Sequence, residues 1–359
     1  MPGRRLADPP SGTLPATGRR PRRRVLLFAA LCTACVVVAG GYLALAAQRA
    51  RDVRAAAPVA VQAAAPASLD GRPRLLFRST ALDSTYGKLA LVPLSRPDGP
   101  RVMTQLDCDR VYMAAGRGLC LAADRGVITT YTAVLFGPDF APRHRLPIPG
   151  LPSRARLSPD GRLAAMTVFV TGHSYAGGAF STRTSIVDTD SGRPLLDDLE
   201  RLTVLRDGRR WRRADFNFWG VTFVPGGDRF YATLASGGRT WLLEGDLRSR
   251  SARVLRGNVE CPSISPDGTR LAYKRRMPGI RVTWRLHVLD LATMTDTPLA
   301  ETRSVDDQVE WLDDRQLLYS LADGDRPTAV TDTWVVPAGG GGSPRILAHA
   351  AFSPAVQRG

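Results

Sequence analysis

The sequence predicts an all-β fold, a six-bladed β-propeller preceded by a single N-terminal transmembrane helix. Three observations lead to this prediction. A Pro/Asp/Gly turn recurs between pairs of apolar strands, its copies follow one another at a regular spacing except for one longer interval between Ser158 and Val224, and the two ends of the strand-rich region complement each other. Repeats of about 40–45 residues with four strands each are typical of propeller blades.

The recurring turn is clearest in two near copies of one sequence. These read ARLSPDGRLAAM at 155–166 and PSISPDGTRLAYK at 262–274, and looser copies lie at 221–234 and 309–321. Each copy joins two apolar strands through residues that favour tight turns. Aligning them with RVYMAAGRGLCLA at 110–122 and with the C-terminal AFSPAVQ predicts six blades. The register points are Ala114, Ser158, Val224, Ser265, Leu312 and Ser353.

The two ends of this region predict how the ring closes. The segment 74–106 has three candidate strands but no innermost one, whereas the C-terminal AFSPAV supplies an innermost strand alone. Together they make one complete blade, which closes the ring without a free edge. An irregular β-sandwich is the alternative fold, but it explains neither the spacing nor the complementary ends.

The N-terminal region predicts a membrane anchor. Residues 25–47 carry no charge, and at about 1.5 Å per residue they are long enough to cross a bilayer core. The arginine-rich tail 1–24 precedes them, so we expect the tail in the cytoplasm and the rest of the chain outside the cell membrane. Residues 48–73 are rich in Ala and Pro and suit a semi-extended linker to the propeller at 74–358.

Three other interpretations of the N-terminal region compete with a retained anchor. Ala44-Leu45-Ala46 resembles a signal-peptidase site, and Arg22-Arg23-Arg24 loosely resembles the start of a twin-arginine signal. The third interpretation is a lipoprotein signal at CTAC, residues 32–35, but this stretch lacks the usual leucine of a lipobox. The apolar run is longer than the core of a typical cleaved signal, which favours a retained, single-pass anchor. Each alternative still places the propeller outside the cytoplasm.

The turn repeats also carry a family resemblance. LSPDGRLAAM at 157–166 and ISPDGTRLAYK at 264–274 resemble the repeat of TolB-type propellers, and LHVLDLATMTDTPLAE resembles the strand pair that follows it. The whole of 74–358 resembles TolB-like (WD-repeat-like) proteins of actinobacterial type, membrane-anchored or secreted. The resemblance implies the fold but not the function, since propellers include binding modules and enzymes. Nothing in the sequence matches the N-terminal domain of TolB itself.

The formal net charge of +16 does not indicate nucleic-acid binding. The chain has only two lysines, and ten of its arginines precede residue 55, close to the predicted membrane helix. No basic run interleaved with aromatic residues follows, as base stacking would require. We therefore expect no nucleic-acid partner.

The stretch TVFVTGHSYAGGAF at 167–180 resembles the Gly-x-Ser-x-Gly nucleophile elbow of serine hydrolases. The elbow needs a helix directly after its serine, but Gly, Ser and Thr follow Ser174 in place of helix formers. Ala176 also replaces the second glycine of the motif. We therefore interpret Ser174 as part of an enlarged loop between the second and third strands of its blade, and not as a nucleophile.

In a four-stranded blade, that loop shares a face with the connections between blades. These connections are polar and aromatic at 212–220, 257–262 and 301–308. Converging polar groups at a concave mouth are typical of a ligand site, although solvated loops and hydrogen bonds between blades explain the same composition. The candidate ligand- or partner-binding residues are His173, Ser174, Tyr175, Asp215, Asn217, Glu260, Asp306, Asp307 and Gln308.

The sequence predicts no catalytic residue, no cofactor and no metal site. Glu260, Asp306 and Asp307 supply oxygen atoms, but they lack the spacing of a known calcium loop. The histidines are scattered and show no zinc pattern. They are His144, His173, His287 and His349.

Three of the five cysteines lie in the predicted propeller, in a compartment where disulfides form. Cys108 and Cys120 are nearest in sequence. Regular pairing of the hairpin strands that carry them would place the two residues several positions out of register, so a disulfide between them requires a local irregularity. Cys261 lies in the opposite blade, and we expect the leftover cysteine to be buried. Cys32 and Cys35 lie in the apolar helix, where we expect them to serve as small apolar side chains and not as a redox pair.

These features favour a non-enzymatic, extracytoplasmic binding protein whose polar face takes an envelope protein, peptide or glycan. The alternative is a propeller enzyme that acts on lactones or glycans, with Asp306 and Asp307 at the channel mouth. A sensory role is less favoured, because the N-terminal tail is too short for an effector domain.

Overall fold

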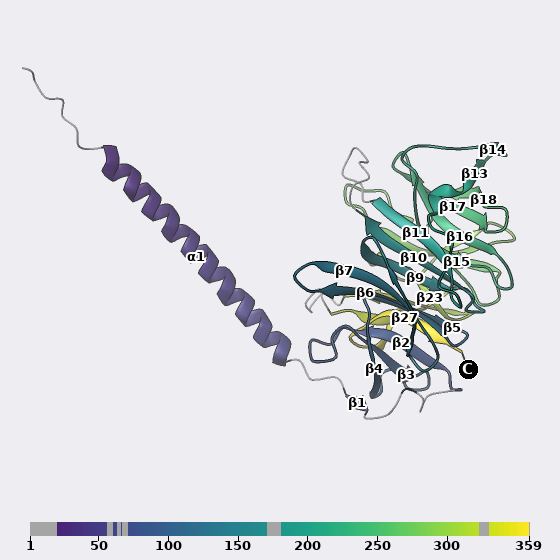
Figure 1. The fold of residues 1–359 in the computed structure, drawn as a ribbon, viewed down its shortest axis with the longest axis horizontal. Coiled ribbons are helices and arrows are strands. Elements are labelled where there is room, and N and C mark those ends of the chain that lie inside the picture. Colours follow the sequence, from purple (N-terminus) through teal and green to yellow (C-terminus); the bar gives the residue numbers. More distant parts are fainter. Residues whose placement is uncertain are drawn as a thin grey trace, which may run out of the picture. The chain divides into compact units, whose positions relative to one another are not determined.

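The structure, a computed structural model, divides into two compact units, Met1–Ala57 and Pro58–Gly359. The first unit contains one helix, and the second contains the strands (Figure 1). The residues that the structure describes are 20–55, 60–62, 66, 71–170, 181–322 and 330–358.

The first unit contains the helix α1 (Arg20–Ala55). Its segment Arg23–Leu45 has a mean hydropathy of 2.2, and its length and composition are sufficient to cross a membrane. The helix continues to Ala55, so the expectation of a semi-extended linker from residue 48 is wrong for residues 48–55. Alanine and arginine, which are strong helix formers, make up most of that stretch.

The second unit is a six-bladed β-propeller, as the sequence predicts (Figure 1). Each blade contains an antiparallel meander of four strands, with one strand innermost, beside the central channel. The innermost strands contact one another in ring order. They are β27 (Ala351–Gln357), β5 (Arg110–Ala114), β9 (Leu151–Leu157), β15 (Asn217–Phe223), β19 (Glu260–Ile264) and β23 (Glu310–Asp313).

The ring closes through the two ends of the propeller sequence, as predicted. The C-terminal β27 pairs antiparallel with β2 (Arg74–Ser79), and Figure 1 shows the two strands side by side. Arg74 Nε donates to Gln357 Oε1 at 2.6 Å across this pair. The short β1 (Val61–Gln62) pairs parallel with the outer strand and covers part of its edge. The other strands of this blade are β3 (Lys88–Pro93) and β4 (Arg101–Asp107).

Four blades consist of four strands only. Their middle strands are buried on both faces because neighbouring blades pack against each side, and they therefore read as continuous apolar runs. The second to fourth strands are β6 (Arg117–Arg125), β7 (Thr129–Phe136) and β8 (Pro142–Pro147); β10 (Leu163–Val170), β11 (Ser181–Asp188) and β12 (Pro194–Leu196); β20 (Arg270–Arg276), β21 (Trp284–Asp290) and β22 (Asp296–Pro298); and β24 (Gln316–Leu321), β25 (Asp332–Pro337) and β26 (Arg345–Ala348).

The remaining blade carries an insertion, which explains the longer interval between the register points Ser158 and Val224. Between β12 and β15 the chain forms a 3₁₀ helix and two short strands. The first of these strands pairs parallel with the outer strand, so the insertion widens this blade instead of adding another. These elements are η2 (Leu199–Arg201), β13 (Thr203–Arg206) and β14 (Arg209–Arg210), and the blade continues with β16 (Arg229–Ser236), β17 (Arg239–Asp246) and β18 (Ser251–Gly257).

The recurring turns are held by the same hydrogen bonds in both near copies. Ser158 Oγ donates to Asp160 Oδ1 at 2.5 Å and accepts the N–H of Leu163 at 2.9 Å. Ser265 Oγ donates to Asp267 Oδ1 at 2.5 Å in the second copy and accepts the equivalent N–H at 3.0 Å. The sequence repeat therefore corresponds to a repeated turn.

The C-terminal register point is wrong, although the number of blades is right. Ser353 lies inside β27 at a bulge, with a φ of +55°, and matches Cys261 in β19, whose φ is +50°. The residue equivalent to Ser265 is therefore Gln357. The Ser-Pro letters of AFSPAVQ resemble the turn, but Ser353 Oγ instead accepts the N–H of Val111 at 3.2 Å.

Adjacent blades pack through apolar side chains, and at one point their backbones nearly touch. Ile186 of one blade lies in the same buried cluster as Phe223 and Phe230 of the next. Gly220, with a φ of +66°, has no room for a side chain, because a Cβ there would lie 2.7 Å from the Cα of Cys261. This close approach helps hold β15 against β19.

The channel has two different mouths. All six inner strands line one cavity of about 360 Å³ on the side of the recurring turns. We call this side the turn face. The other side carries the connections between blades and the loops between second and third strands, and we call it the connection face. The predicted site residues that the structure describes lie in or beside connections on the connection face.

Candidate ligand-binding site

Three of the nine predicted site residues, His173, Ser174 and Tyr175, lie in 171–180, outside the described residues. The interpretation of Ser174 as a loop residue therefore stays a prediction. The other six form two groups. Glu260, Asp306, Asp307 and Gln308 meet at the channel mouth of the connection face, whereas Asp215 and Asn217 make their hydrogen bonds elsewhere.

Asp215 and Asn217 hold the propeller together. The Asp215 carboxylate accepts Ser236 Oγ at 2.7 Å and the N–H of Gly237 at 2.6 Å, which fixes the turn between β16 and β17. Asn217 is buried, and its Oδ1 accepts the N–H of Thr182 at 3.0 Å. That bond joins β15 to β11 of the preceding blade. These contacts account for both polar residues without a ligand.

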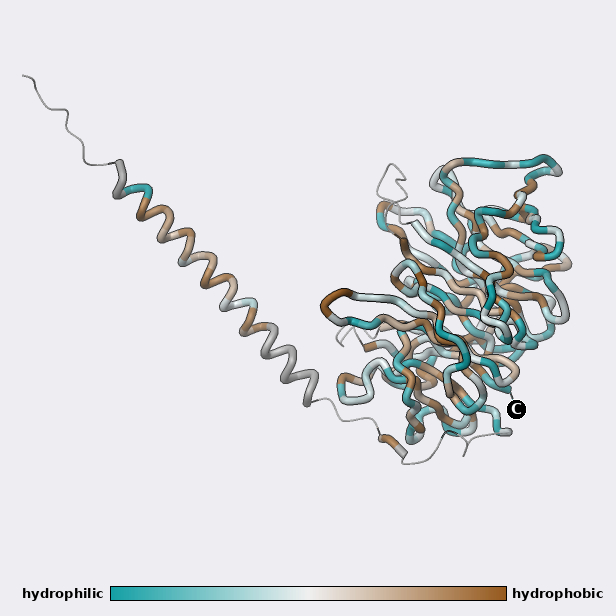
Figure 2. The backbone as a smooth tube through the Cα atoms, in the orientation of Figure 1, coloured by the Kyte–Doolittle hydropathy of each residue, from teal (hydrophilic) through white to brown (hydrophobic). Residues whose placement is uncertain are grey.

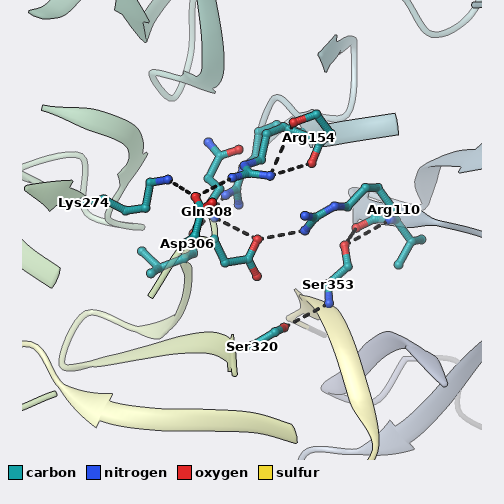
Figure 3. Close-up of polar contacts among 12 residues, drawn as sticks. Arg110, Arg154, Lys274, Asp306, Gln308, Ser320 and Ser353 are labelled. Carbon is teal, nitrogen blue, oxygen red and sulfur yellow. Dashed lines mark hydrogen bonds and ion pairs between the residues drawn. The ribbon is translucent and has the colours of Figure 1, made fainter. Parts of the chain in front are cut away.

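Asp306 is the exposed charge of the mouth. Lys274 of β20 donates to Asp306 Oδ1, and Arg154 Nη2 of β9 lies 3.5 Å from the same oxygen (Figure 3). Lys274 Nζ also lies 3.9 Å from Glu260 Oε2. The side chain of Asp306 is 59% exposed, whereas those of Lys274 and Arg154 are 3% and 11% exposed. One solvent-facing carboxylate thus sits on two nearly buried cations.

The two residues after Asp306 point into the ring. Asp307 is buried and accepts Arg110 Nη1 at 2.8 Å. Gln308 Nε2 donates to the carbonyl oxygens of Val221 at 3.0 Å and Pro262 at 2.8 Å, so it links the connection before β23 to two other inner strands. Both residues therefore lock the ring around the mouth.

Deeper in the channel, a buried ion pair separates the two mouths. Arg156 donates to the Glu310 carboxylate, and Tyr112 Oη donates to Glu310 Oε1 at 3.2 Å. The side chains of Arg156 and Glu310 are 6% and 4% exposed. The space between this pair and Arg110 is about 20 Å³, roughly the volume of one water molecule. A ligand on the connection face therefore meets a closed floor.

Burial and charge act differently on the two acids beside Lys274. Burial raises the pKa of Glu260, and the nearby Lys274 only partly opposes it. At Asp306, desolvation also favours the neutral form, but the charges of Lys274 and Arg154 outweigh it and lower the pKa. Asp306 therefore stays ionised at neutral pH. In the floor, burial first and Glu310 second raise the pKa of Tyr112 to about 12, so its hydroxyl stays a donor.

The cations of this site are not among the residues predicted from the sequence. Arg154 and Arg156 alternate along β9, and Arg110 and Tyr112 alternate along β5, the period that points side chains of an inner strand toward the channel. That pattern is visible in the sequence. Lys274 has no comparable pattern, because it is a charge on a second strand, and only the fold brings it beneath Asp306.

The site suits recognition by hydrogen bonds and charge. Asp306 is a fixed, ionised acceptor, held by the nearly buried cations Lys274 and Arg154. Among the described residues, no group of three His, Cys, Asp or Glu side chains is placed to hold a metal ion.

Cys108 and Cys120 form a disulfide, with Cα atoms 5.4 Å apart. The irregularity that this bond requires is present. Cys108 precedes β5 and so lies outside the hairpin register, in which Val111 faces Cys120. Cys261 is free and buried, and Cys32 and Cys35 are free and exposed on α1.

Comparisons with known proteins agree on the fold. No protein-family model matches the chain, and no curated protein matches it. Among solved structures, TolB from Acinetobacter baumannii is similar with a TM-score of 0.51 at 14% identity, over 81% of this chain and 70% of that chain. A nidogen/laminin complex also reaches 0.51, at 13% identity, over 79% of this chain and 98% of that chain. A putative TolB from Agrobacterium tumefaciens reaches 0.46 at 11% identity, over 77% and 87%.

At these identities the likeness shows the fold alone, because one fold supports many functions. The second unit is therefore a TolB-like, six-bladed β-propeller.

Proposed function

We propose that this protein is a membrane-anchored, extracytoplasmic binding protein of the cell envelope. Its connection face takes an envelope protein, peptide or glycan, with Asp306 at the centre of the contact. The observation that carries the proposal is the exposed Asp306 carboxylate, held in place by the nearly buried Lys274 and Arg154.

The arrangement supports binding for three physical reasons. A carboxylate that two cations already position loses little conformational freedom when a ligand arrives. Its oxygens accept hydrogen bonds, so they suit peptide N–H groups, amines and glycan hydroxyls. The buried Arg156–Glu310 pair closes the channel beneath, which confines the ligand to the mouth.

The same charges make Asp306 a poor general base. A base that works at neutral pH has a pKa near 7, whereas the cations lower the pKa of Asp306 below the ordinary carboxylate value. This favours a binding protein over the lactone- or glycan-acting enzyme.

The envelope location rests on α1. Its apolar segment follows arginines, which hold the N-terminal end of a membrane helix in the cytoplasm. A phosphatase reporter fused after residue 70 should therefore be active, because this enzyme matures only outside the cytoplasm. An inactive phosphatase, with an active cytoplasmic reporter at the same position, overturns the orientation.

Asp306→Asn tests the binding site directly. The full-length chain is cross-linked in envelope membranes, and the captured material is compared with that of the wild type. Loss of one charge-assisted contact should weaken capture about tenfold or more. Asp190→Asn is the matched control, because Asp190 is 65% exposed and pairs with Arg117 on the turn face.

Equal capture by all three proteins contradicts the proposed site. Hydrolysis of a lactone or glycan by the purified chain, lost in Asp306→Asn but kept in Asp190→Asn, establishes the enzyme instead.

A further inference from the structure

Two loops on the connection face end in fully exposed aliphatic side chains. Val127 and Ile128, between β6 and β7, are 107% and 79% exposed, and Figure 2 shows the hydrophobic tip of that hairpin. Ile280, between β20 and β21, is 106% exposed. A single exposed aliphatic residue is ordinary, but here such residues occupy the outermost positions of two separate loops.

The two loops bound one surface. Their blades, β5–β8 and β19–β22, lie on opposite sides of the ring. Both loops join a second strand to a third strand, so both emerge on the connection face. The apolar tips therefore stand on either side of the channel mouth.

A basic groove of about 470 Å³ lies beside the Ile280 loop. Arg239, at the start of β17, and Arg276, at the end of β20, both line it and are both exposed. Trp241 and Met277 add apolar wall, and none of the described residues that line the groove is acidic. Guanidinium groups bind phosphate oxygens in pairs, so the groove suits a phosphate headgroup.

We propose that the connection face docks on an anionic phospholipid bilayer. Arg239 and Arg276 bind headgroup phosphates, while Ile280, Val127 and Ile128 enter the bilayer interface. Aliphatic tips beside basic side chains are the combination that binds proteins to anionic membrane surfaces. The chain also carries α1, whose segment Arg23–Leu45 is sufficient to span a bilayer.

This inference rests on the membrane anchoring proposed above and not on any ligand of Asp306. Docking turns the mouth toward the bilayer. The ligands that reach Asp306 in the docked state are therefore molecules at the membrane surface.

The full-length chain in lipid nanodiscs provides the test. A fluorophore sensitive to polarity is attached at Ile280→Cys, in a chain that also carries Cys32→Ser and Cys35→Ser. The discs contain phosphatidylcholine alone or phosphatidylcholine with phosphatidylglycerol, each with acyl chains brominated or not. We expect bromine to quench the fluorophore in the anionic discs and much less in the neutral discs. The control fluorophore is at Gly341→Cys, an exposed turn-face position with open space around it, and should not be quenched.

Arg239→Glu with Arg276→Glu tests the headgroup contact. Each arginine near an anionic surface contributes about 1 kcal/mol, so the docked-to-free ratio should fall about 30-fold or more. Arg193→Glu with Arg315→Glu makes the same charge change on the turn face and should leave quenching unchanged.

Failure of the anchor and failure of docking give different results. A chain that does not co-purify with the discs overturns the anchoring. A chain that co-purifies but shows equal quenching at positions 280 and 341, or equal quenching in neutral and anionic discs, overturns the docking.

Discussion

The two faces of the propeller are built in different ways. On the turn face, Ser158 and Ser265 make the same hydrogen bonds in two different blades. On the connection face, the connections between blades differ in length and composition. Among the described residues, only the connection before β23 places a carboxylate, that of Asp306, between Lys274 and Arg154. One face repeats, and the other does not.

This difference separates stability from recognition. Every blade must turn from its first strand to its second, so turn residues recur because the fold needs them. A ligand breaks the symmetry of a ring, so the residues that recognise it need to occur once. Substitutions in the recurring turns should therefore lower stability, and substitution of Asp306 on the connection face should lower binding.

The largest loss of stability should come from the channel floor, between the two faces. Glu310→Ala leaves Arg156 buried without its partner and should cost about 3–5 kcal/mol, measured by urea unfolding of the full-length chain in mild detergent. Arg156→Met with Glu310→Leu removes both charges and should recover most of that loss. A loss below about 1 kcal/mol for Glu310→Ala, the size expected of a surface pair, contradicts this account of the floor.

A turn-face substitution should have an intermediate effect. Asp267→Ala removes the acceptor of Ser265 Oγ and of the Thr269 N–H, and should cost about 1–2 kcal/mol in the same assay. Asp160→Ala, at the equivalent position, should cost somewhat less, because Asp267 accepts two further bonds, from Thr269 Oγ1 at 2.8 Å and Arg270 Nη2 at 3.2 Å. No loss of stability at Asp160 means that the sequence repeat is not an energetic repeat.

The pH dependence sharpens the same comparison. Desolvation opposes ionisation of Asp267, but hydrogen bonds from Ser265 and Thr269 outweigh it and lower its pKa in the folded protein. A carboxylate with a lowered folded pKa stabilises the protein above its unfolded pKa, which is about 3.9, and that stabilisation is lost as the pH falls further. The gap between wild type and Asp267→Asn should therefore be widest near neutral pH and narrow below about pH 4. A constant gap contradicts the role of ionisation.

The smallest change in stability should come from the connection face. Asp306 itself is exposed and Lys274 keeps Glu260 at 3.9 Å as a second partner, so Asp306→Asn should cost about 1 kcal/mol, seen as a small fall in melting temperature. Binding should still fall, as proposed above. A large drop in melting temperature instead assigns Asp306 to the fold and removes the contrast between the faces.

The architecture can be predicted from the sequence, because the signals for it are local and repeated. The residues of a Ser-Pro-Asp-Gly turn predict the geometry of that turn, and the number of its copies along the chain predicts the number of blades. The closure of the ring is also readable, since strands that lack a partner at one end need one from the other. The local errors have local causes: Ser353 shares letters with the turn, and residues 48–55 extend a helix into a Pro-containing segment.

The set of polar residues that forms the site depends on the three-dimensional arrangement of the blades. Asp215, Asn217 and Asp306 are all polar residues in or beside connections between blades, so the sequence does not distinguish their roles. Those roles depend on partners far along the chain. Lys274 reaches Asp306 because β20 ends beneath the connection to β23, and a strand pattern carries no information about that distance. The alternation of residues along a strand predicts which side of the strand each side chain faces. The role of a charged residue depends instead on which other charges the folded ring places within a few ångströms of it.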